Sequence, residues 1–221
     1  EAVGKSDAEG GAAVDFLLDA ARTWGSDLIY VPTGPLTNLA LSARRDAEAL
    51  RAIGGIVFMG GALTIPGNVT PGAEANIAND PEAADAVLRS GVPVTMVGLD
   101  VTHQTILPFD ELACWRALGT PAGAAFADIV GYYFNFYLEH QGYLGGCALH
   151  DPLAVAIALD PTLAGTLDIN LKVDLDGPFR GRTIGDPLRL HDPQKSAKVA
   201  VTVDAPRFVE RFCERVRQAL G

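Results

Sequence analysis

Apolar side chains follow two spacings along the first hundred residues, and these spacings alternate. Short apolar runs with strand character occupy residues 28–32, 56–58 and 94–99. Apolar residues three and four positions apart predict helices at residues 12–24, from residue 36 onward and at 81–89, the last capped by Asp80 with Pro81 at its first position. Strands that alternate with helices imply a parallel sheet with helices on both faces.

The second half of the chain continues this pattern and adds a hairpin. A helix is predicted at residues 108–137, and the tetrapeptide at 149–152 opens an apolar helix at 153–159. Residues 168–174 alternate apolar and polar side chains, and a turn at 176–178 leads to residues 180–184, which predicts a β-hairpin. A strand at 198–203 and a helix at 206–220 close the chain. The predicted fold class is α/β: a mostly parallel, Rossmann-like sheet with helices on both faces plus a β-hairpin.

The connection from Met59 to Asn76 is unusually long for a compact α/β fold. Loops of this length are uncommon unless they are disordered or functional, and the apolar flanks argue against disorder. Asn68, Glu74 and Asn76 offer two amides and one carboxylate, which can donate to and accept from a polyhydroxylated ligand such as a sugar. We therefore predict a binding loop.

Three predicted strands end close to polar or unusual residues. Thr33, Met59 and Asp100 each fall at or just past one of these ends. Ligands of open α/β sheets bind beyond the carboxyl ends of the strands, so the three connections are expected to converge on one edge of the sheet.

The tripeptide His150-Asp151-Pro152 allows two compatible interpretations. Asp151 before Pro152 is typical of a helix N-cap. Asp151 could equally be a hard oxygen ligand for Ca²⁺ or Mg²⁺, with His150 as a proton donor whose pKa lies near neutrality.

Structural interpretations remain open for the other candidates. Asn68 can be a turn residue, Met59 can fill the core, and Thr33 can belong to a plain turn, although its carbonyl could ligate a hard cation. The aromatic cluster at residues 132–137 is more typical of a helix core than of a platform for a planar base. His103 is interpreted as structural, and no role is assigned to His140 or His191.

Composition narrows the classes of function. The chain has 221 residues, of which 48% are hydrophobic and 20% charged, and its formal net charge of −10 argues against nucleic acid as a partner. No apolar run approaches the roughly 18 residues that span a bilayer. Three widely separated cysteines suggest free thiols and a cytoplasmic location. Glu1 is the first residue, and no signal-peptide pattern follows it.

Taken together, these motifs resemble the inosine-uridine preferring nucleoside hydrolase family. The resemblance covers nearly the whole chain, in the family's order and spacing, as one domain of residues 1–221 that corresponds to the C-terminal two-thirds of the family domain. The blocks that carry it are Val31 to Asn38, Met59 to Gly61, Gly67 to Val69 with Ala73 to Asn76, Asp80 to Ala84, Val97 to Gln104 and Leu149 to Ala154.

This resemblance implies Ca²⁺-dependent hydrolysis of the N-glycosidic bond of ribonucleosides, through an oxocarbenium-like transition state. By position, Asp151 would ligate calcium through its carboxylate and Thr33 through its main-chain carbonyl. His150 would act as the candidate general acid near the leaving base. The ribose would be held by Met59, Asn68, Glu74 and Asn76. The family also suggests a homo-oligomer, either a dimer or a tetramer, that binds a small ribonucleoside and no membrane.

One departure from the family pattern bears on activity. The family begins with a strand that ends in an aspartate-rich motif of the Asp-x-Asp-x-x-x-Asp-Asp type, and this chain has no such motif. We therefore expect an N-terminally truncated nucleoside hydrolase fold whose site is incomplete, since calcium takes six to eight oxygens. The alternative is a protein that binds ribose or a nucleoside, or another partner, without catalysis.

Overall fold

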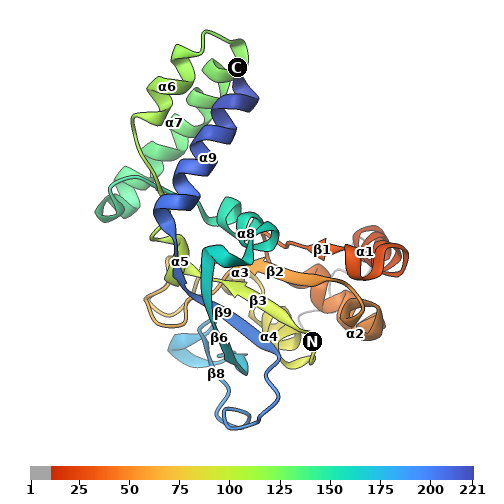
Figure 1. The fold of residues 1–221 in the computed structure, drawn as a ribbon. Coiled ribbons are helices and arrows are strands. Elements are labelled where there is room, and N and C mark those ends of the chain that lie inside the picture. Colours follow the sequence, from red (N-terminus) through yellow and green to blue (C-terminus); the bar gives the residue numbers. More distant parts are fainter. Residues whose placement is uncertain (1–10) are drawn as a thin grey trace.

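The centre of the molecule is a twisted five-stranded sheet (Figure 1). The computed structural model describes residues 11–221. Along the sheet, the strands are β1 (Ile29–Tyr30), β2 (Gly55–Met59), β3 (Val94–Val97), β9 (Ala197–Val203) and β6 (Ala164–Ile169). The first four run parallel to one another, and β6 pairs antiparallel with β9 at the edge. The predicted, mostly parallel α/β sheet is confirmed.

Two hydrophobic clusters lie on opposite faces of this sheet. Phe58 belongs to one cluster and Val57 to the other, as the two-residue period of a strand requires. The first cluster packs the sheet against α1 (Gly11–Trp24), α2 (Thr37–Arg51) and α4 (Pro81–Arg89). The second packs it against α8 (His150–Leu159), with contributions from α7 (Pro121–Gln141) and α9 (Ala205–Leu220). Both faces are therefore covered by helices.

Helices α6 (Glu111–Ala117), α7 and α9 form an arm that extends away from the sheet (Figure 1). The prediction of a single helix at residues 108–137 was wrong, because the chain turns between α6 and α7. Gly119 has a φ of +70°, which favours glycine. The Thr120 hydroxyl then accepts a hydrogen bond from the backbone N–H of Gly123 at 3.0 Å and caps α7, and Pro121 takes the first helical position.

The predicted hairpin is present, but its first strand is shorter than expected. β7 (Leu171–Val173) pairs antiparallel with β8 (Thr183–Gly185). Residues 168 and 169 instead end β6, a strand that the sequence did not reveal. Residues 165–168 are exposed, so this edge strand lacks the buried apolar pattern by which strands are recognised.

Short elements complete the fold and bring the loops to the sheet edge. They are α3 (Ala75–Asn79), α5 (Leu99–Thr102), β4 (Ile106–Leu107) and β5 (Cys147–Ala148), the last two paired antiparallel. Cys114, Cys147 and Cys213 are all free thiols, as predicted. Across residues 11–221, no helix is both long and apolar enough to cross a membrane.

Candidate functional site

The carboxyl ends of β1 and β2 meet at the side chain of Asn76. Its Nδ2 donates hydrogen bonds to the main-chain carbonyls of Met59 at 3.1 Å and Thr33 at 3.3 Å. Met59 is buried and its backbone N–H donates to the Pro32 carbonyl at 3.0 Å, whereas Thr33 is exposed. Thr33 and Met59 therefore lie together at one edge of the sheet, as the strand-end argument predicted, and Asn76 bridges them.

Glu74 is a buried carboxylate that fastens both ends of the loop. One oxygen accepts from the backbone N–H of Asn76 at 3.0 Å, and the other accepts from Gly61 at 2.9 Å and Ile77 at 3.2 Å. These bonds cap α3 and hold the turn after β2. Burial raises the pKa of Glu74 although the three N–H donors lower it, and the nearby Asp151 carboxylate raises it further.

A second buried carboxylate, Asp100, holds the middle of the loop. It accepts from the backbone N–H of Leu63 at 2.8 Å and from both the N–H and the hydroxyl of Thr64 at 2.7 and 2.6 Å. On the other side, the Thr183 hydroxyl accepts from the Ala62 N–H at 3.0 Å. The loop is thus fixed by side chains from α5 and β8.

Asn68 has a structural contact that matches its turn interpretation. Its Oδ1 accepts from the backbone N–H of Ala75 at 3.0 Å, which closes the loop next to Glu74. Its Nδ2 makes no hydrogen bond within the described part of the chain, so one amide group is still available to a ligand. The roles of Asn68, Glu74 and Asn76 in holding a sugar stay predictions.

Asp151 does not cap its helix, contrary to the N-cap prediction. α8 begins at His150, and the N-cap is Leu149, whose N–H donates to the Thr105 carbonyl at 2.9 Å. Pairing of β4 with β5 fixes that register, so Asp151 lies inside the first turn. Within residues 11–221 its carboxylate accepts no hydrogen bond. Asp151 is an exposed residue, yet partial desolvation of its carboxyl group raises its pKa.

His150 is held at both ring nitrogens by hydroxyl groups. Nδ1 lies 2.8 Å from Thr102 Oγ1 and Nε2 lies 2.6 Å from Tyr137 Oη. Burial, with a smaller contribution from the His103 ring 5.7 Å away, lowers the pKa of His150 to about 4. The expectation of a pKa near neutrality was wrong, because a sequence motif does not show desolvation. A neutral imidazole has one donor and one acceptor nitrogen. One hydroxyl can accept from the N–H, and the other can donate to the second nitrogen.

The aromatic cluster of α7 divides between core and surface. Phe134 and Tyr137 are buried, as a helix core requires, whereas Tyr132, Tyr133 and Phe136 are exposed. A cavity of about 200 Å³ lies beside this helix. Tyr133, His150 and Asp151 are among its lining residues, together with apolar side chains of α6, β5 and α9. A mostly apolar lining with a few polar groups is a general property of sites for small ligands, although this space is smaller than most.

The oxygen atoms that a metal would need are only partly present. Within residues 11–221, no three His, Cys, Asp or Glu side chains gather closely enough to hold a metal ion. The Asp151 carboxylate and the Thr33 carbonyl are oxygens of the type that Ca²⁺ takes, but the ion takes six to eight, and the Asn76 amide already donates to the Thr33 carbonyl. The described residues therefore do not form a calcium shell by themselves.

Four residues that shape the site had no signal, or the wrong one, in the sequence. Thr102, Tyr137 and Thr183 are common core or strand residues, and only the fold brings their hydroxyls to His150 and the loop. Asp100 was placed at a strand end, but its role in holding the loop depends on contacts 36 and 37 residues away in sequence. Nothing in local spacing could have found those contacts.

Comparison with known proteins gives consistent matches. The family model described as inosine-uridine preferring nucleoside hydrolase matches residues 2–210. A purine-preferring ribonucleoside hydrolase from Gardnerella vaginalis is 55% identical and superposes with a TM-score of 0.91, over 94% of this chain and 66% of that one. A plant nucleoside hydrolase is 32% identical, with a TM-score of 0.84, over 93% of this chain and 66% of that one.

Another relative differs in base preference from the purine-preferring enzyme of Gardnerella vaginalis. The pyrimidine-specific ribonucleoside hydrolase RihB of Shigella flexneri serotype 5b is 39% identical over 202 residues. These residues are 91% of this chain and 64% of that protein. The chain thus spans 64–66% of the length of these three relatives.

Proposed function

Because the chain belongs to the inosine-uridine preferring nucleoside hydrolase family, we propose that it serves to hydrolyse the N-glycosidic bond of ribonucleosides, releasing ribose and a free base. The observation that carries this proposal is the carboxylate of Asp151. Within residues 11–221 it accepts no hydrogen bond, although it lies at the start of α8, near Glu74 and next to His150. A free carboxylate at a helix N-terminus, on the ligand-binding edge of the sheet, is suited to bind a ligand.

The ribose would lie over the fixed loop. Glycoside cleavage passes through an oxocarbenium-like state, so nearby carboxylates such as Asp151 and Glu74 stabilise the positive charge that develops on the sugar. The Asn68 amide and the backbone around Met59 and Asn76 would bind the hydroxyls. Because Glu74 Oε2 already accepts two backbone N–H bonds, its contribution to ribose is mainly electrostatic.

His150 would serve the departing base as a hydrogen-bonding group. Thr102 and Tyr137 engage both of its ring nitrogens, so the ring would have to release one of these hydroxyls before it could donate to the base. A positioned donor at the leaving group contributes around 10² to 10⁴ in rate. The cavity beside Tyr133 offers space for a planar base next to this ring.

Calcium is the cofactor that the family implies for this reaction. Thr33 and Asp151 would hold it in this chain, and the ion would orient ribose hydroxyls and lower the pKa of a bound water. Thr33 and Asp151 do not complete the shell of six to eight oxygens around Ca²⁺. Calcium-dependent hydrolysis therefore needs further oxygen ligands.

The test is release of reducing sugar from inosine and uridine, with and without added CaCl₂. Both substrates are needed because one relative is purine-preferring and another is pyrimidine-specific. Base release that requires calcium and is lost in Asp151→Asn is the expected result once the further oxygen ligands of the ion are supplied. Lack of release from either nucleoside, with an intact fold by circular dichroism, would contradict hydrolysis by this chain.

A second candidate function is binding of a nucleoside without turnover. The small number of calcium ligands favours it for this chain. Isothermal titration of ribose and inosine separates the two functions: heat of binding without base release, with calcium present, supports the binding protein. A homo-oligomeric state stays a prediction, which sedimentation would measure.

A further inference from the structure

Thr102 ends the short helix α5 and carries a hydroxyl that is closed off from solvent, since its exposed fraction is 0%. Its backbone N–H donates to the Gly98 carbonyl at 3.1 Å, and its carbonyl accepts from the Thr105 hydroxyl at 3.0 Å. A fully enclosed hydroxyl must find its hydrogen-bond partners among the residues that surround it. The environment of Thr102 therefore determines where its hydroxyl proton points.

Among residues 11–221, the Thr102 hydroxyl has one hydrogen-bond partner, the Nδ1 atom of His150 at 2.8 Å. A hydroxyl has one proton and two lone pairs, so it can either donate to Nδ1 or accept from it. If it accepts, its own proton has no acceptor among the described residues, and a buried donor without an acceptor is strongly disfavoured. If it donates, no proton at this contact is left over. Thr102 therefore donates, and Nδ1 is the acceptor.

The opposite ring nitrogen then carries the proton of the neutral ring. A neutral imidazole has one N–H group, and the hydrogen bond at one nitrogen decides which nitrogen holds it. The Nε2–H group faces Tyr137 Oη, 2.6 Å away. The Tyr137 hydroxyl hydrogen-bonds in turn with that of Tyr133, which is 45% exposed and can donate to water. Donors and acceptors thus alternate from Thr102 to the surface, and no proton stays unpaired.

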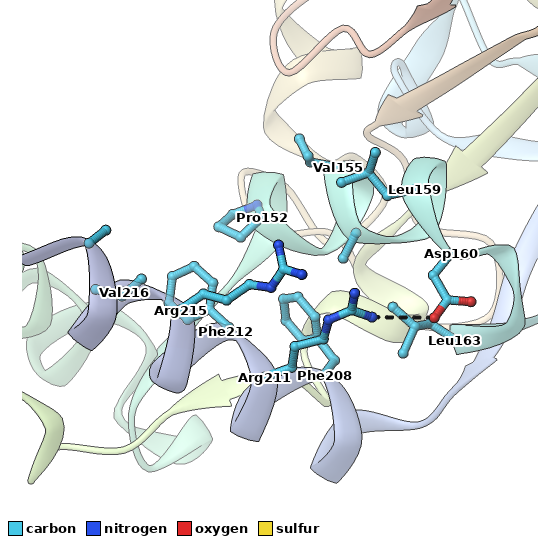
Figure 2. Close-up of a pocket in the computed structure, with 12 residues that line it drawn as sticks. Pro152, Val155, Leu159, Asp160, Leu163, Phe208, Arg211, Phe212, Arg215 and Val216 are labelled. Atoms are coloured by element: carbon cyan, nitrogen blue, oxygen red, sulfur yellow. Dashed lines mark hydrogen bonds and ion pairs between the residues drawn. The ribbon is translucent and has the colours of Figure 1, made fainter.

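The position of the His150 ring is set by its helix, independently of the two hydroxyls. α8 is held against α9 at its C-terminal end, where Asp160 pairs with Arg207 at 2.6 Å and lies 3.5 Å from Arg211 (Figure 2). These contacts lie at the opposite end of the helix from His150. The helix therefore places the ring, and the hydroxyls around the ring decide which of its nitrogens is protonated.

We propose that Thr102 is a positioning residue that keeps His150 in its Nε2–H form. The N–H group then lies on the side of α7, whose Tyr133 lines the same cavity as His150, and the lone pair lies on the side of the buried helix α5. To donate to a base in that cavity, the ring would release the Tyr137 hydroxyl and keep its bond to Thr102. This role rests on the hydrolysis proposed above, whereas the tautomer does not.

The tautomer decides what the ring can offer to a departing base. In the Nε2–H form, the nitrogen on the cavity side donates a hydrogen bond, and the ring stays neutral. In the Nδ1–H form, the same nitrogen has only a lone pair and accepts a hydrogen bond. A departing base is stabilised by a donor. Only the Nε2–H form is therefore suited to the role proposed for His150.

NMR of the ring nitrogens measures the tautomer directly and needs no turnover. Long-range proton–nitrogen spectra of protein with ¹⁵N-labelled histidine distinguish a protonated ring nitrogen from an unprotonated one at neutral pH. The signals of His150 are identified by their absence from His150→Gln. Wild type should show a protonated Nε2 and an unprotonated Nδ1. A protonated Nδ1 with an unprotonated Nε2 in wild type would overturn the proposal.

Three variants separate the effect of Thr102 from that of Tyr137. Thr102→Val keeps the shape and removes the donor, so the Nδ1 signal should shift to that of a nitrogen without a hydrogen bond. Thr102→Ser keeps a hydroxyl and should give the wild-type Nδ1 signal. Tyr137→Phe should keep the Nε2–H form, because Thr102 still donates to Nδ1. An unchanged Nδ1 signal in Thr102→Val, or an Nδ1–H ring in Tyr137→Phe, would show that Thr102 does not set the tautomer.

Arg211→Gln is the control for packing of the helix. It weakens an exposed ion pair at the far end of α8 and leaves both hydrogen bonds of the ring in place, so the His150 nitrogen signals should not shift. A shift as large as that of Thr102→Val would mean that the signals report helix packing, which would count against the proposal.

Kinetics then connect the tautomer to the reaction. In protein that releases base from inosine or uridine, Thr102→Val should lower kcat at least about tenfold with little change in KM, and Thr102→Ser should recover most of the rate. An unchanged kcat beside a shifted Nδ1 signal would show that the tautomer does not serve the reaction. Lack of base release from wild type would contradict the proposed hydrolysis, while the spectra still decide the tautomer.

Discussion

Glu74 and Asp151 are two carboxylates at the same edge of the sheet, with opposite surroundings. Glu74 is buried and accepts three backbone hydrogen bonds, whereas Asp151 is exposed and accepts none within the described residues. Both have a raised pKa because of desolvation, so the pKa direction does not distinguish them. Their hydrogen bonds do: the first carboxylate organises the loop, and the second is free to meet a ligand.

This difference extends to the segments around the two residues. The loop from Met59 to Asn76 is fixed at its ends by Glu74 and in its middle by Asp100. The start of α8 is fixed by its backbone and by the His150 ring, which leaves its carboxylate unengaged. Substitutions should therefore affect the free energy of unfolding strongly in the loop and weakly at Asp151.

The largest expected loss of stability is that of Asp100→Ala. It removes an acceptor from two part-buried backbone N–H groups and a hydroxyl, and a donor left unpaired away from water costs about 1–3 kcal/mol. We expect the free energy of unfolding in a urea titration to fall by about 3 kcal/mol. Thr64→Val removes only the hydroxyl donor and is the control, with a loss of about 1 kcal/mol. Equal losses for the two variants would mean that Asp100 does not hold the loop backbone.

Glu74→Gln should lower the free energy of unfolding by about 2 kcal/mol, somewhat less than Asp100→Ala. The amide keeps the shape and one acceptor oxygen, but its NH₂ group faces backbone N–H donors that need an acceptor. The same urea titration measures the effect. A neutral result would show that the loop is held without this carboxylate, and the contrast with Asp151 would then disappear.

The pH dependence of stability gives a smaller effect with a definite sign. Burial raises the pKa of Glu74 in the folded state, so that state binds the proton more tightly than the unfolded chain does. The contribution of protonated Glu74 to the free energy of unfolding is therefore fully present below the pKa of the unfolded chain, near about 4.3. It is lost as the pH rises through the raised pKa of the folded state. Urea titrations from pH 4 upward should show a steeper decline for wild type than for Glu74→Gln. Identical slopes of the free energy of unfolding against pH for the two proteins would mean that the pKa of Glu74 is not raised in the folded state.

Asp151→Asn should have the smallest effect on stability, within about 0.5 kcal/mol. Its carboxylate makes no hydrogen bond in the described structure, and only the favourable interaction with the helix N-terminus is lost. Any calcium-dependent base release should nevertheless disappear. A loss of stability as large as that of Glu74→Gln would show that Asp151 is structural.

Local chemistry allowed several features to be predicted from the sequence. The Asp80-Pro81 pair starts α4 as predicted, because the Asp80 carboxylate accepts the Ala83 N–H at 3.1 Å and Pro81 needs no partner for its nitrogen. Alternation of strands and helices predicted the parallel sheet, and the strand ends predicted the edge where Thr33 and Met59 lie together.

Other features depended on contacts between distant segments. The same Asp-Pro pattern failed at Asp151, because pairing of β4 with β5 and the Leu149 bond to Thr105 start α8 two residues earlier than the local motif suggested. Strand β6 was missed because an edge strand need not bury an apolar face.

By itself, the sequence determined the fold class, the family and the residues that gather at the sheet edge, since periodicity, caps and turn residues act over a few positions. Only the tertiary structure decided which carboxylate is buried and which is free, and that His150 is a neutral ring held by Thr102 and Tyr137. Burial and hydrogen bonding depend on groups brought together from far along the chain, and no local pattern encodes them.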